Sequence, residues 1–422
     1  MGEAPKGKAP SAGGAAVVVC VLVAGALILA AVGRGTQSKA PPSPAAPAAL
    51  PIPADAVQLP QNTLVEWEHE KRPGPATYTS GGLLLTLSDS PGSDDHMPVL
   101  EVRSADGRLT RVEGERWMGD ASAEIGVGHI DAASAEPQVL FTTFSGGAHC
   151  CASTKLVEKL DGAWRVVDLA WQDGDRLGQF PADIDGDGRR EFQLADGRFL
   201  YAFTSYADSL SPPTVKRVNR GIVEDLSAEP RFRKVFQSYA AEAKSECEKG
   251  RNGACAAYVA AAARAGQIEA AWPVMLAAYQ RDSDWTLPTA CVRKPSSGEC
   301  AEADTVRFAT YPEALRWFLG DTGYLPAIYL PDPASTGPSF GCEPTQTEVL
   351  KLICGTPELA KADRELAWAY QRTLALSADW TAAREAQRQF LALRDGSPPD
   401  AFTLLRVYQA RLEQLNGVLA GL

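Results

Sequence analysis

The cysteines constrain this chain more than any other feature. Nine cysteines occur in 422 residues: one lies in an apolar run near the N-terminus, and the other eight are close neighbours in pairs. An even set of close pairs is typical of disulfides formed in an oxidising compartment. The sequence therefore predicts a chain whose bulk is exported. The expected pairs are Cys150/Cys151, Cys247/Cys255, Cys291/Cys300 and Cys342/Cys354.

Alternatives stay open for three of the pairs. The Cys247/Cys255 and Cys291/Cys300 pairs could ligate zinc, but their spacings exceed the short separation typical of structural zinc sites, so disulfides are favoured. The adjacent Cys150 and Cys151 could form a vicinal bridge or pair with other cysteines. With His149 they could also form a redox or metal centre, which would make the protein a thiol or metal enzyme.

The N-terminal segment contains the only long apolar run. Residues 15–32 carry no charge and would span about 27 Å as a helix, enough for a hydrocarbon core. We expect residues 1–33 to form a single-pass inner-membrane anchor with a periplasmic or other extracytoplasmic bulk after it. The alternative is a cleaved signal peptide and secretion. Residues 34–61 are rich in Pro and Ala and predict an extended linker.

Three further regions follow from the hydrophobic pattern. Residues 62–227 contain short apolar runs separated by turn signals, residues 228–332 are rich in alanine with helical spacing, and residues 338–422 predict a helical bundle. The predicted fold class is α+β multidomain: an N-terminal transmembrane helix, an antiparallel β domain, a cystine-stapled helical domain and a C-terminal helical bundle. The expected strands include Leu83–Leu87, Val99–Arg103, Gln138–Phe144, Lys155–Leu160, Trp164–Leu169 and Phe199–Thr204.

An acidic loop in the β region predicts a cation site. Asp183, Asp185, Asp187 and Glu191 could supply carboxylates and Arg189 its carbonyl, while two intervening glycines permit a tight curl. Calcium is the expected ion, because it prefers several oxygen ligands and would relieve repulsion among the carboxylates. The loop resembles the D-x-D-G-D-G-x-x-[DE] loops of FG-GAP and VCBS-type extracellular repeats.

Helix signals in the C-terminal region are local. The pair Thr345 and Glu348 predicts a capping box for a helix that runs to about Cys354. Thr356 and Pro357 then predict the start of a second helix. Apolar residues continue at three-and-four spacing to about Leu415, which predicts a small bundle.

This region resembles the N-terminal domain of the LprI-type lysozyme-inhibitor family. The family pattern is P-S-F-x-C, a second cysteine, L-x-x-x-D-x-x-L-x-x-x-Y, then Q-R-x-[WF]-L-x-x-R and Y-x-x-R. A further cysteine pair usual in the family is missing around residues 395–401. The resemblance implies an envelope binding protein with lysozyme as its partner. The matching residues are Pro338, Ser339, Phe340, Cys342, Cys354, Leu359, Asp363, Leu366, Tyr370, Gln387, Arg388, Arg394, Tyr408 and Arg411.

Charge helps to separate classes of partner. Residues 55–227 contain 28 acids and 16 bases, whereas residues 338–422 contain ten acids and nine bases. Nucleic acid is therefore not an expected partner, since phosphate contacts need clustered Lys and Arg. No catalytic motif is recognised, so the sequence predicts a membrane-anchored envelope binding protein and no enzyme. The alternatives are a structural or adhesive calcium-binding surface protein and the thiol or metal enzyme.

Overall fold

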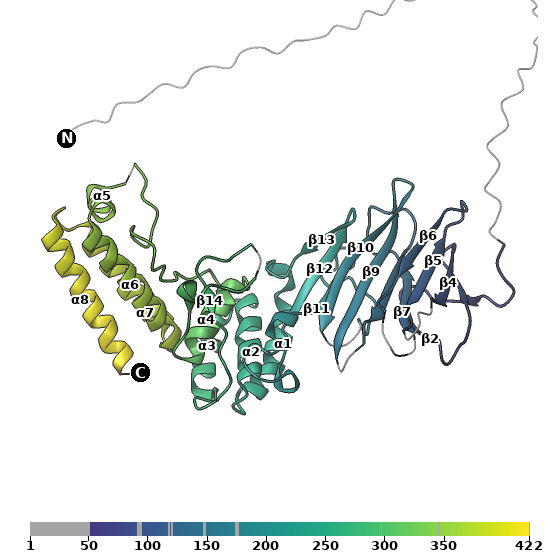
Figure 1. Ribbon diagram of the computed structural model, residues 1–422, viewed down its shortest axis with the longest axis horizontal. Coiled ribbons are helices and arrows are strands. Elements are labelled where there is room, and N and C mark those ends of the chain that lie inside the picture. Colours follow the sequence, from purple (N-terminus) through teal and green to yellow (C-terminus); the bar gives the residue numbers. More distant parts are fainter. Residues whose placement is uncertain are drawn as a thin grey trace, which may run out of the picture. The chain divides into compact units, whose positions relative to one another are not determined.

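The computed structural model describes residues 51–90, 95–116, 119, 121–146, 149–173, 177–296, 298–344 and 346–421. The elements below all belong to one compact unit, Ala48–Leu422. They run from three stacked sheets through a group of four helices to a C-terminal bundle (Figure 1).

The first two sheets contain five strands each. In the first sheet β1 pairs with β3 in parallel, and the remaining pairings are antiparallel. In order across this sheet the strands are β1 (Val57–Gln58), β3 (Ala76–Ser80), β4 (Leu83–Asp89), β5 (Pro98–Arg103) and β6 (Leu109–Glu113). The second sheet is antiparallel, in the order β10 (Ala163–Asp173), β9 (Cys150–Leu160), β8 (Gln138–Phe144), β7 (Ser122–Gly128) and β2 (Leu64–Glu68).

Alternating apolar residues join these sheets as a sandwich. Leu85 and Leu87 of β4 point into a core that also contains Ile125 and Phe141 of the second sheet. Successive strand residues face opposite sides, so each sheet places every second residue in this core. The opposite face of the second sheet is buried as well, because Leu156 of β9 packs into a separate core.

A third sheet covers that opposite face. It is antiparallel, in the order β11 (Phe192–Ala195), β12 (Pro213–Asn219) and β13 (Ile222–Asp225). Phe192 and Leu194 of β11 share a core with Leu140 and Leu156 of the second sheet. Val215 of β12 instead belongs to the core of the helices, so the third sheet joins the sheets to the helical region.

Four helices pack beside the third sheet. The largest core cluster contains residues before and after position 227, the predicted end of the β region. It continues into the C-terminal region at Leu374 and Trp380. The helices are α1 (Arg233–Cys247), α2 (Asn252–Arg264), α3 (Ile268–Ala278) and α4 (Tyr311–Asp321), and β14 (Ala290–Cys291) pairs with β15 (Thr305–Val306) between α3 and α4. The α2 helix is almost entirely buried, because its alanines allow close packing against α1 and α3.

The C-terminal bundle has a core of its own. Its helices are α5 (Glu348–Gly355), α6 (Pro357–Leu376), α7 (Trp380–Asp395) and α8 (Ala401–Ala420). Leu359 and Leu366 of α6 pack with Phe390 of α7 and Leu404 of α8. The α6 helix also contacts α4, where Arg372 forms an ion pair with Glu313 at 2.6 Å.

The structure corrects the predicted fold class at the N-terminus. Within the described part of the chain, no helix combines the length and the apolar character needed to cross a membrane. The α+β architecture is confirmed, but the N-terminal transmembrane helix is not supported. The apolar run that suggested it, residues 15–32, lies outside the described residues, as do residues 34–50 of the predicted linker. The rest of that linker is described, and Val57–Gln58 within it form β1.

Two local predictions are also corrected. Residues 199–204 do not form a strand, because Phe199 and Phe203 both turn into the helical core and lie edge-on to Phe318. The α5 helix begins after Thr347, whose side chain accepts a hydrogen bond from the Leu350 amide. A cap two residues after the predicted one still satisfies a free amide of the first turn.

Candidate binding surface and cation loop

Polar residues of the LprI-like pattern meet around Asp363 of α6. This carboxylate is 4% exposed. One oxygen accepts hydrogen bonds from the Ser339 amide and hydroxyl at 2.7 and 2.6 Å, and the other accepts the Tyr408 hydroxyl at 2.8 Å. Arg394 lies 3.8 Å away, and its guanidinium lies over the ring of Phe340. These residues of the pattern therefore hold together four parts of the bundle: the segment around Ser339 that precedes α5, and the helices α6, α7 and α8.

Two further polar residues of the pattern, Gln387 and Arg411, join α7 to α8. Arg411 of α8 donates hydrogen bonds to the side-chain oxygen of Gln387 of α7 at 3.3 and 3.4 Å, and to Gln414 at 3.2 Å. Partial burial lowers the pKa of Arg411. Within the described part of the chain, Arg411 forms no ion pair with a carboxylate. Its charge is thus held beside neutral amides only.

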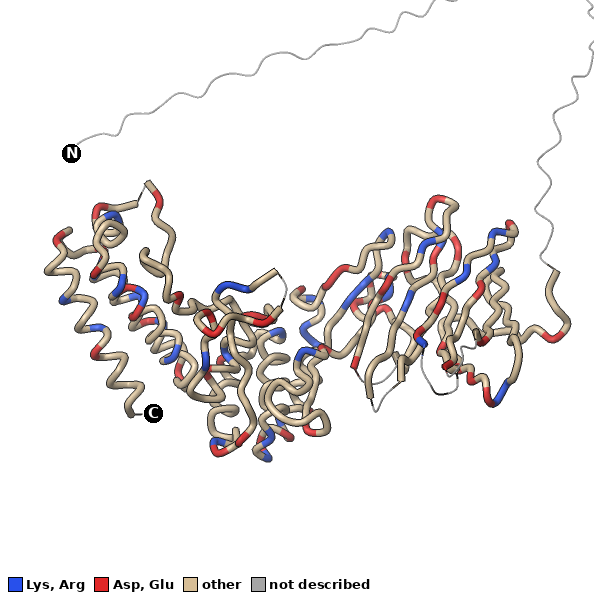
Figure 2. The backbone as a smooth tube through the Cα atoms, in the orientation of Figure 1, with Lys and Arg blue, Asp and Glu red and all other residues tan. Residues whose placement is uncertain are grey.

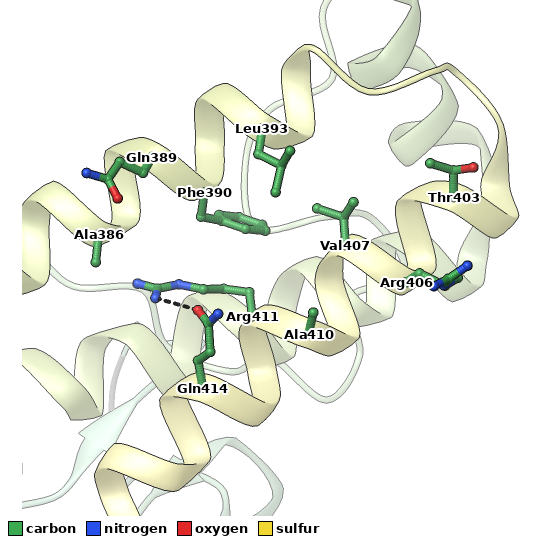
Figure 3. Close-up of a pocket in the computed structure, with 10 residues that line it drawn as sticks. All are labelled: Ala386, Gln389, Phe390, Leu393, Thr403, Arg406, Val407, Ala410, Arg411 and Gln414. Carbon is green, nitrogen blue, oxygen red and sulfur yellow. Dashed lines mark hydrogen bonds between the residues drawn. The ribbon is translucent and has the colours of Figure 1, made fainter.

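A groove of about 510 Å³ lies between α7 and α8 and includes Arg411. Figure 3 shows Phe390 and Leu393 of α7 facing Val407 of α8, with the Arg411 guanidinium beside Gln414. Leu393 is 61% exposed, and Phe402 at the start of α8 is 71% exposed. The described lining is Ala386, Gln389, Phe390, Leu393, Thr403, Arg406, Val407, Ala410, Arg411 and Gln414.

The helical spacing of apolar residues does not predict this groove. The helical spacing assigned α8 a single apolar face, the one that contains Leu404 and Tyr408. Leu393 of α7 and Phe402 of α8 are exposed and lie off the buried faces of their helices, and such apolar residues are the signal that could have marked the groove. An apolar residue outside the buried face of its helix lines a groove only where a neighbouring helix supplies the other wall, and the sequence of one helix does not specify that neighbour.

The acidic loop lies between the second and third sheets in the chain. Oxygens of Asp183, Asp185 and Asp187 all lie within 4.8 Å of one another. Asp183 accepts hydrogen bonds from the amides of Gly186 and Gly188, whose φ angles of 82° and 84° lie in the left-handed region. Glycine adopts this conformation without steric cost, so the predicted curl is present.

Arginines already neutralise part of this loop. Arg231, which precedes α1, lies 2.8 Å from Asp185 and 3.3 Å from Asp187. A side-chain hydrogen bond from Arg189 is the main cause that lowers the pKa of Asp187 to about 2. Arg189 thus holds Asp187 through its side chain. The interaction with Arg231 connects the loop to the start of the helical region.

Glu191 is the most deeply buried acid of the loop. Its side chain is fully buried, one oxygen accepts a hydrogen bond from the Ile184 amide at 3.0 Å, and the other has no hydrogen-bond partner among the described residues. Burial is the main cause that raises its pKa. That oxygen lies 3.9 Å from the Arg217 guanidinium. The convergent carboxylates are those of Asp183, Asp185 and Asp187, and they form a donor set that fits a hard cation.

The residues around His149 are engaged with one another. The His149 ring bonds to Asp173 at 2.5 Å through one nitrogen and to the Tyr201 hydroxyl at 2.9 Å through the other, and it stacks on Tyr206. Cys150 and Cys151 form a disulfide with each other. Both ring nitrogens and both sulfurs have partners in this arrangement, and the thiol or metal enzyme stays an untested hypothesis.

The other predicted disulfides are present in the structure. Cys247 pairs with Cys255 where α1 leads into α2, and Cys291 pairs with Cys300 near β14. Cys342 pairs with Cys354 and ties the incoming segment of the bundle to α5. Short loops of this kind restrict the unfolded chain.

Comparison with known proteins finds a family match in the helical region, before the LprI-like pattern begins. Residues 231–323 match a family model described as the sll0997 C-terminal domain. The chain is 34% identical over 260 residues to the uncharacterized protein y4bJ of Sinorhizobium fredii, which is 60% of this chain but 40% of that relative's length. No solved structure matches the chain.

A second relative is matched over more of its length. The chain is 34% identical over 248 residues to the probable thylakoid lumen protein sll0997 of Synechocystis, and this alignment covers 56% of the chain and 71% of the relative. The chain therefore belongs to the family of the sll0997 protein.

Proposed function

We propose that this protein is an extracytoplasmic binding protein that holds a protein partner on its C-terminal bundle. The supporting observation is the exposed apolar groove between α7 and α8, on the bundle that resembles LprI-type inhibitors. Leu393 is 61% exposed in this groove, beside Phe390 and Val407, and an apolar hollow of this kind is typical of interaction surfaces. Lysozyme is the partner that the resemblance implies.

Two observations support the extracytoplasmic compartment. The structure contains four disulfides, which persist in oxidising environments. A relative is named as a probable thylakoid lumen protein, which is also a location outside the cytoplasm.

Calorimetric titration of the full chain with a lysozyme tests the proposed function. The titration is run at low and at high salt, because the acidic β region attracts a cationic protein through long-range charge that salt screens. We expect binding that survives high salt and is weakened at least about tenfold by Leu393→Ser, which removes an exposed apolar contact. Ile222→Ser in β13, which alters a residue 66% exposed and outside the bundle, is the matched control.

Binding that salt abolishes and that Leu393→Ser leaves unchanged would contradict the proposal. A chain truncated before the bundle is not a clean control. The Trp272 indole donates a hydrogen bond to the Ala375 carbonyl at 3.0 Å, so truncation would disrupt the helical core.

Calcium binding at residues 183–191 is a second proposed function, supported by the convergent carboxylates and the buried oxygen of Glu191. Asp183, Asp185, Asp187 and Glu191 would hold the ion, with Arg189 offering its backbone carbonyl. A bound calcium ion would supply positive charge that offsets repulsion among these carboxylates. Asp185 of the loop pairs with Arg231, which precedes α1. An ion that orders the loop would therefore also affect how the start of α1 is held.

Calcium titration of the full chain, with a thermal melt in chelator, tests this site. A ligand that binds only the folded state at 100 times its Kd stabilises that state by about 2.7 kcal/mol, so the melting temperature should rise with calcium. Asp183→Asn should remove both the binding heat and the rise, whereas Asp168→Asn on exposed β10 should preserve them. No heat and no rise with the unaltered chain would reject the site.

A further inference from the structure

Two arginines give the groove between α7 and α8 a definite charge. Arg406 and Arg411 both line it, whereas none of the described lining residues is Asp or Glu. Figure 2 shows acidic and basic residues interspersed along most of the backbone, which makes a groove lined by residues of one sign notable. Within the described part of the chain, neither arginine forms an ion pair.

The surroundings of Arg411 indicate what kind of group the groove could bind. Its guanidinium is partly removed from water, which is the main cause that lowers its pKa, and its bonds go to the neutral amides of Gln387 and Gln414. A partly desolvated cation gains most from a carboxylate that binds bidentately. The groove therefore has a place for an anion that the described residues do not fill.

The apolar part of the groove sets the shape of the occupant. Its apolar lining is Phe390 and Leu393 of α7 and Val407 of α8. Along α8 the groove extends from Thr403 to Gln414, a distance of about 16 Å or three helical turns. An amphipathic helix laid in such a groove buries apolar residues at i, i+3 or i+4 and i+7. Both the length and the apolar lining fit a helix of this size.

We propose that this groove binds an amphipathic helix of a protein partner, with a Glu or Asp beside its apolar face that pairs with Arg411. The inference rests on the proposed function of the bundle and names the segment that the partner presents. The partner as a whole need not be acidic, since one carboxylate next to the apolar face satisfies the arginine.

Two labelled synthetic peptides test the proposal against the full chain by fluorescence polarisation. Both are helices of about four turns with leucines at i, i+3, i+4 and i+7. The leucines are flanked by Glu in one peptide and by Lys in the other. We expect the Glu peptide to bind at least about tenfold more tightly, which corresponds to about 1.4 kcal/mol.

Variants separate the charge from the apolar contact. Arg411→Gln should remove the preference for Glu over Lys, and Arg406→Gln should reduce it without altering the bonds to Gln387. Leu393→Ser should weaken both peptides. Arg388→Gln is the control, because this α7 arginine pairs with Glu385 and does not line the groove. Circular dichroism melts confirm that each variant is folded.

Each outcome decides between occupants. Equal binding of the two peptides, or a Glu preference that survives Arg411→Gln in a folded protein, would overturn the proposal. Sedimentation of a dimer that Leu393→Ser dissociates would identify a second copy as the occupant and would also overturn it. Lysozyme binding without peptide binding would reject this inference alone, while Glu-peptide binding without lysozyme binding would reject lysozyme as partner and support the inference.

Discussion

Asp363 connects several parts of the C-terminal bundle through its buried carboxylate. Its buried carboxylate accepts three hydrogen bonds and lies close to Arg394, which is 8% exposed. Removing one partner from a buried charged network leaves the others unsatisfied, which costs more than the bond itself. The sequence pattern marked this aspartate, but only the fold shows that its role is to join three parts of the bundle.

Asp363→Ala should destabilise the protein by about 3 kcal/mol or more, since it leaves the buried Tyr408 hydroxyl and the Ser339 donors without their acceptor and removes the buried carboxylate beside Arg394. Urea denaturation measures the loss. Asp395→Ala removes the exposed partner of Arg394 and should cost under about 1 kcal/mol. Similar losses for the two variants would contradict the assigned role.

Glu158 of β9 predicts a pH dependence of stability. The side chain is buried, and burial first and the neighbouring Asp131 second raise its pKa to about 7. A carboxyl whose pKa is higher in the folded than in the unfolded state binds more protons when folded. Its contribution to stability is therefore present at acidic pH and is lost as pH rises from about 4.5 to about 7.

Replacing this group tests the prediction. Glu158→Gln keeps the shape without the charge, so it should stabilise the protein at pH 8 relative to the unaltered chain and should flatten the fall in stability between pH 5 and 7. Chemical denaturation at a series of pH values measures both effects. An unchanged pH profile would show that Glu158 does not titrate in this window.

At the scale of elements, predictions from sequence succeeded where the signal was local. The α6 helix begins at Pro357 directly after Thr356, as expected, because a proline in the first turn needs no amide partner. The strand expected at 199–204 was wrong because Phe199 and Phe203 are buried by α4, a contact distant in sequence. Apolar runs do not by themselves distinguish a strand from a buried loop.

The Cys342–Cys354 disulfide is the covalent constraint at the start of the bundle. Its cysteines are twelve residues apart, so replacing both by Ser should cost about 3 kcal/mol through the greater freedom of the unfolded chain. Urea denaturation of the double variant measures this. Adding reductant to the variant serves as the control for the other bridges. A loss well under 1 kcal/mol would indicate that the segment is held mainly by Ser339 and Asp363.

At the scale of the whole molecule, the bundle is joined to the helical region by two tryptophans. Trp272 of α3 and Trp380 of α7 are buried with their ring centroids 4.9 Å apart, and each indole donates to a carbonyl at the end of α6. The large core cluster is therefore continuous across the predicted boundary between residues 332 and 338.

Trp380→Ala should destabilise the protein by about 3–5 kcal/mol, the usual range for deletion of a buried aromatic ring. Because the ring joins two regions, we also expect one cooperative transition to become two. Denaturation followed in parallel by far-ultraviolet circular dichroism and tryptophan fluorescence detects the split. Trp285→Ala, which removes a more exposed indole, is the control. A single transition in Trp380→Ala would show that other contacts couple the regions.

Features that depend on neighbours along the chain follow from the amino-acid sequence alone. These are the favoured pairing of neighbouring cysteines, the curl of the acidic loop, and the helices of the C-terminal bundle with their periodic apolar faces. Tertiary structure decided which arginines face the loop, which groups meet at Asp363, and which face of α7 and α8 remains uncovered. Those properties depend on burial and on charges brought together from distant positions, and periodicity along one segment does not specify them.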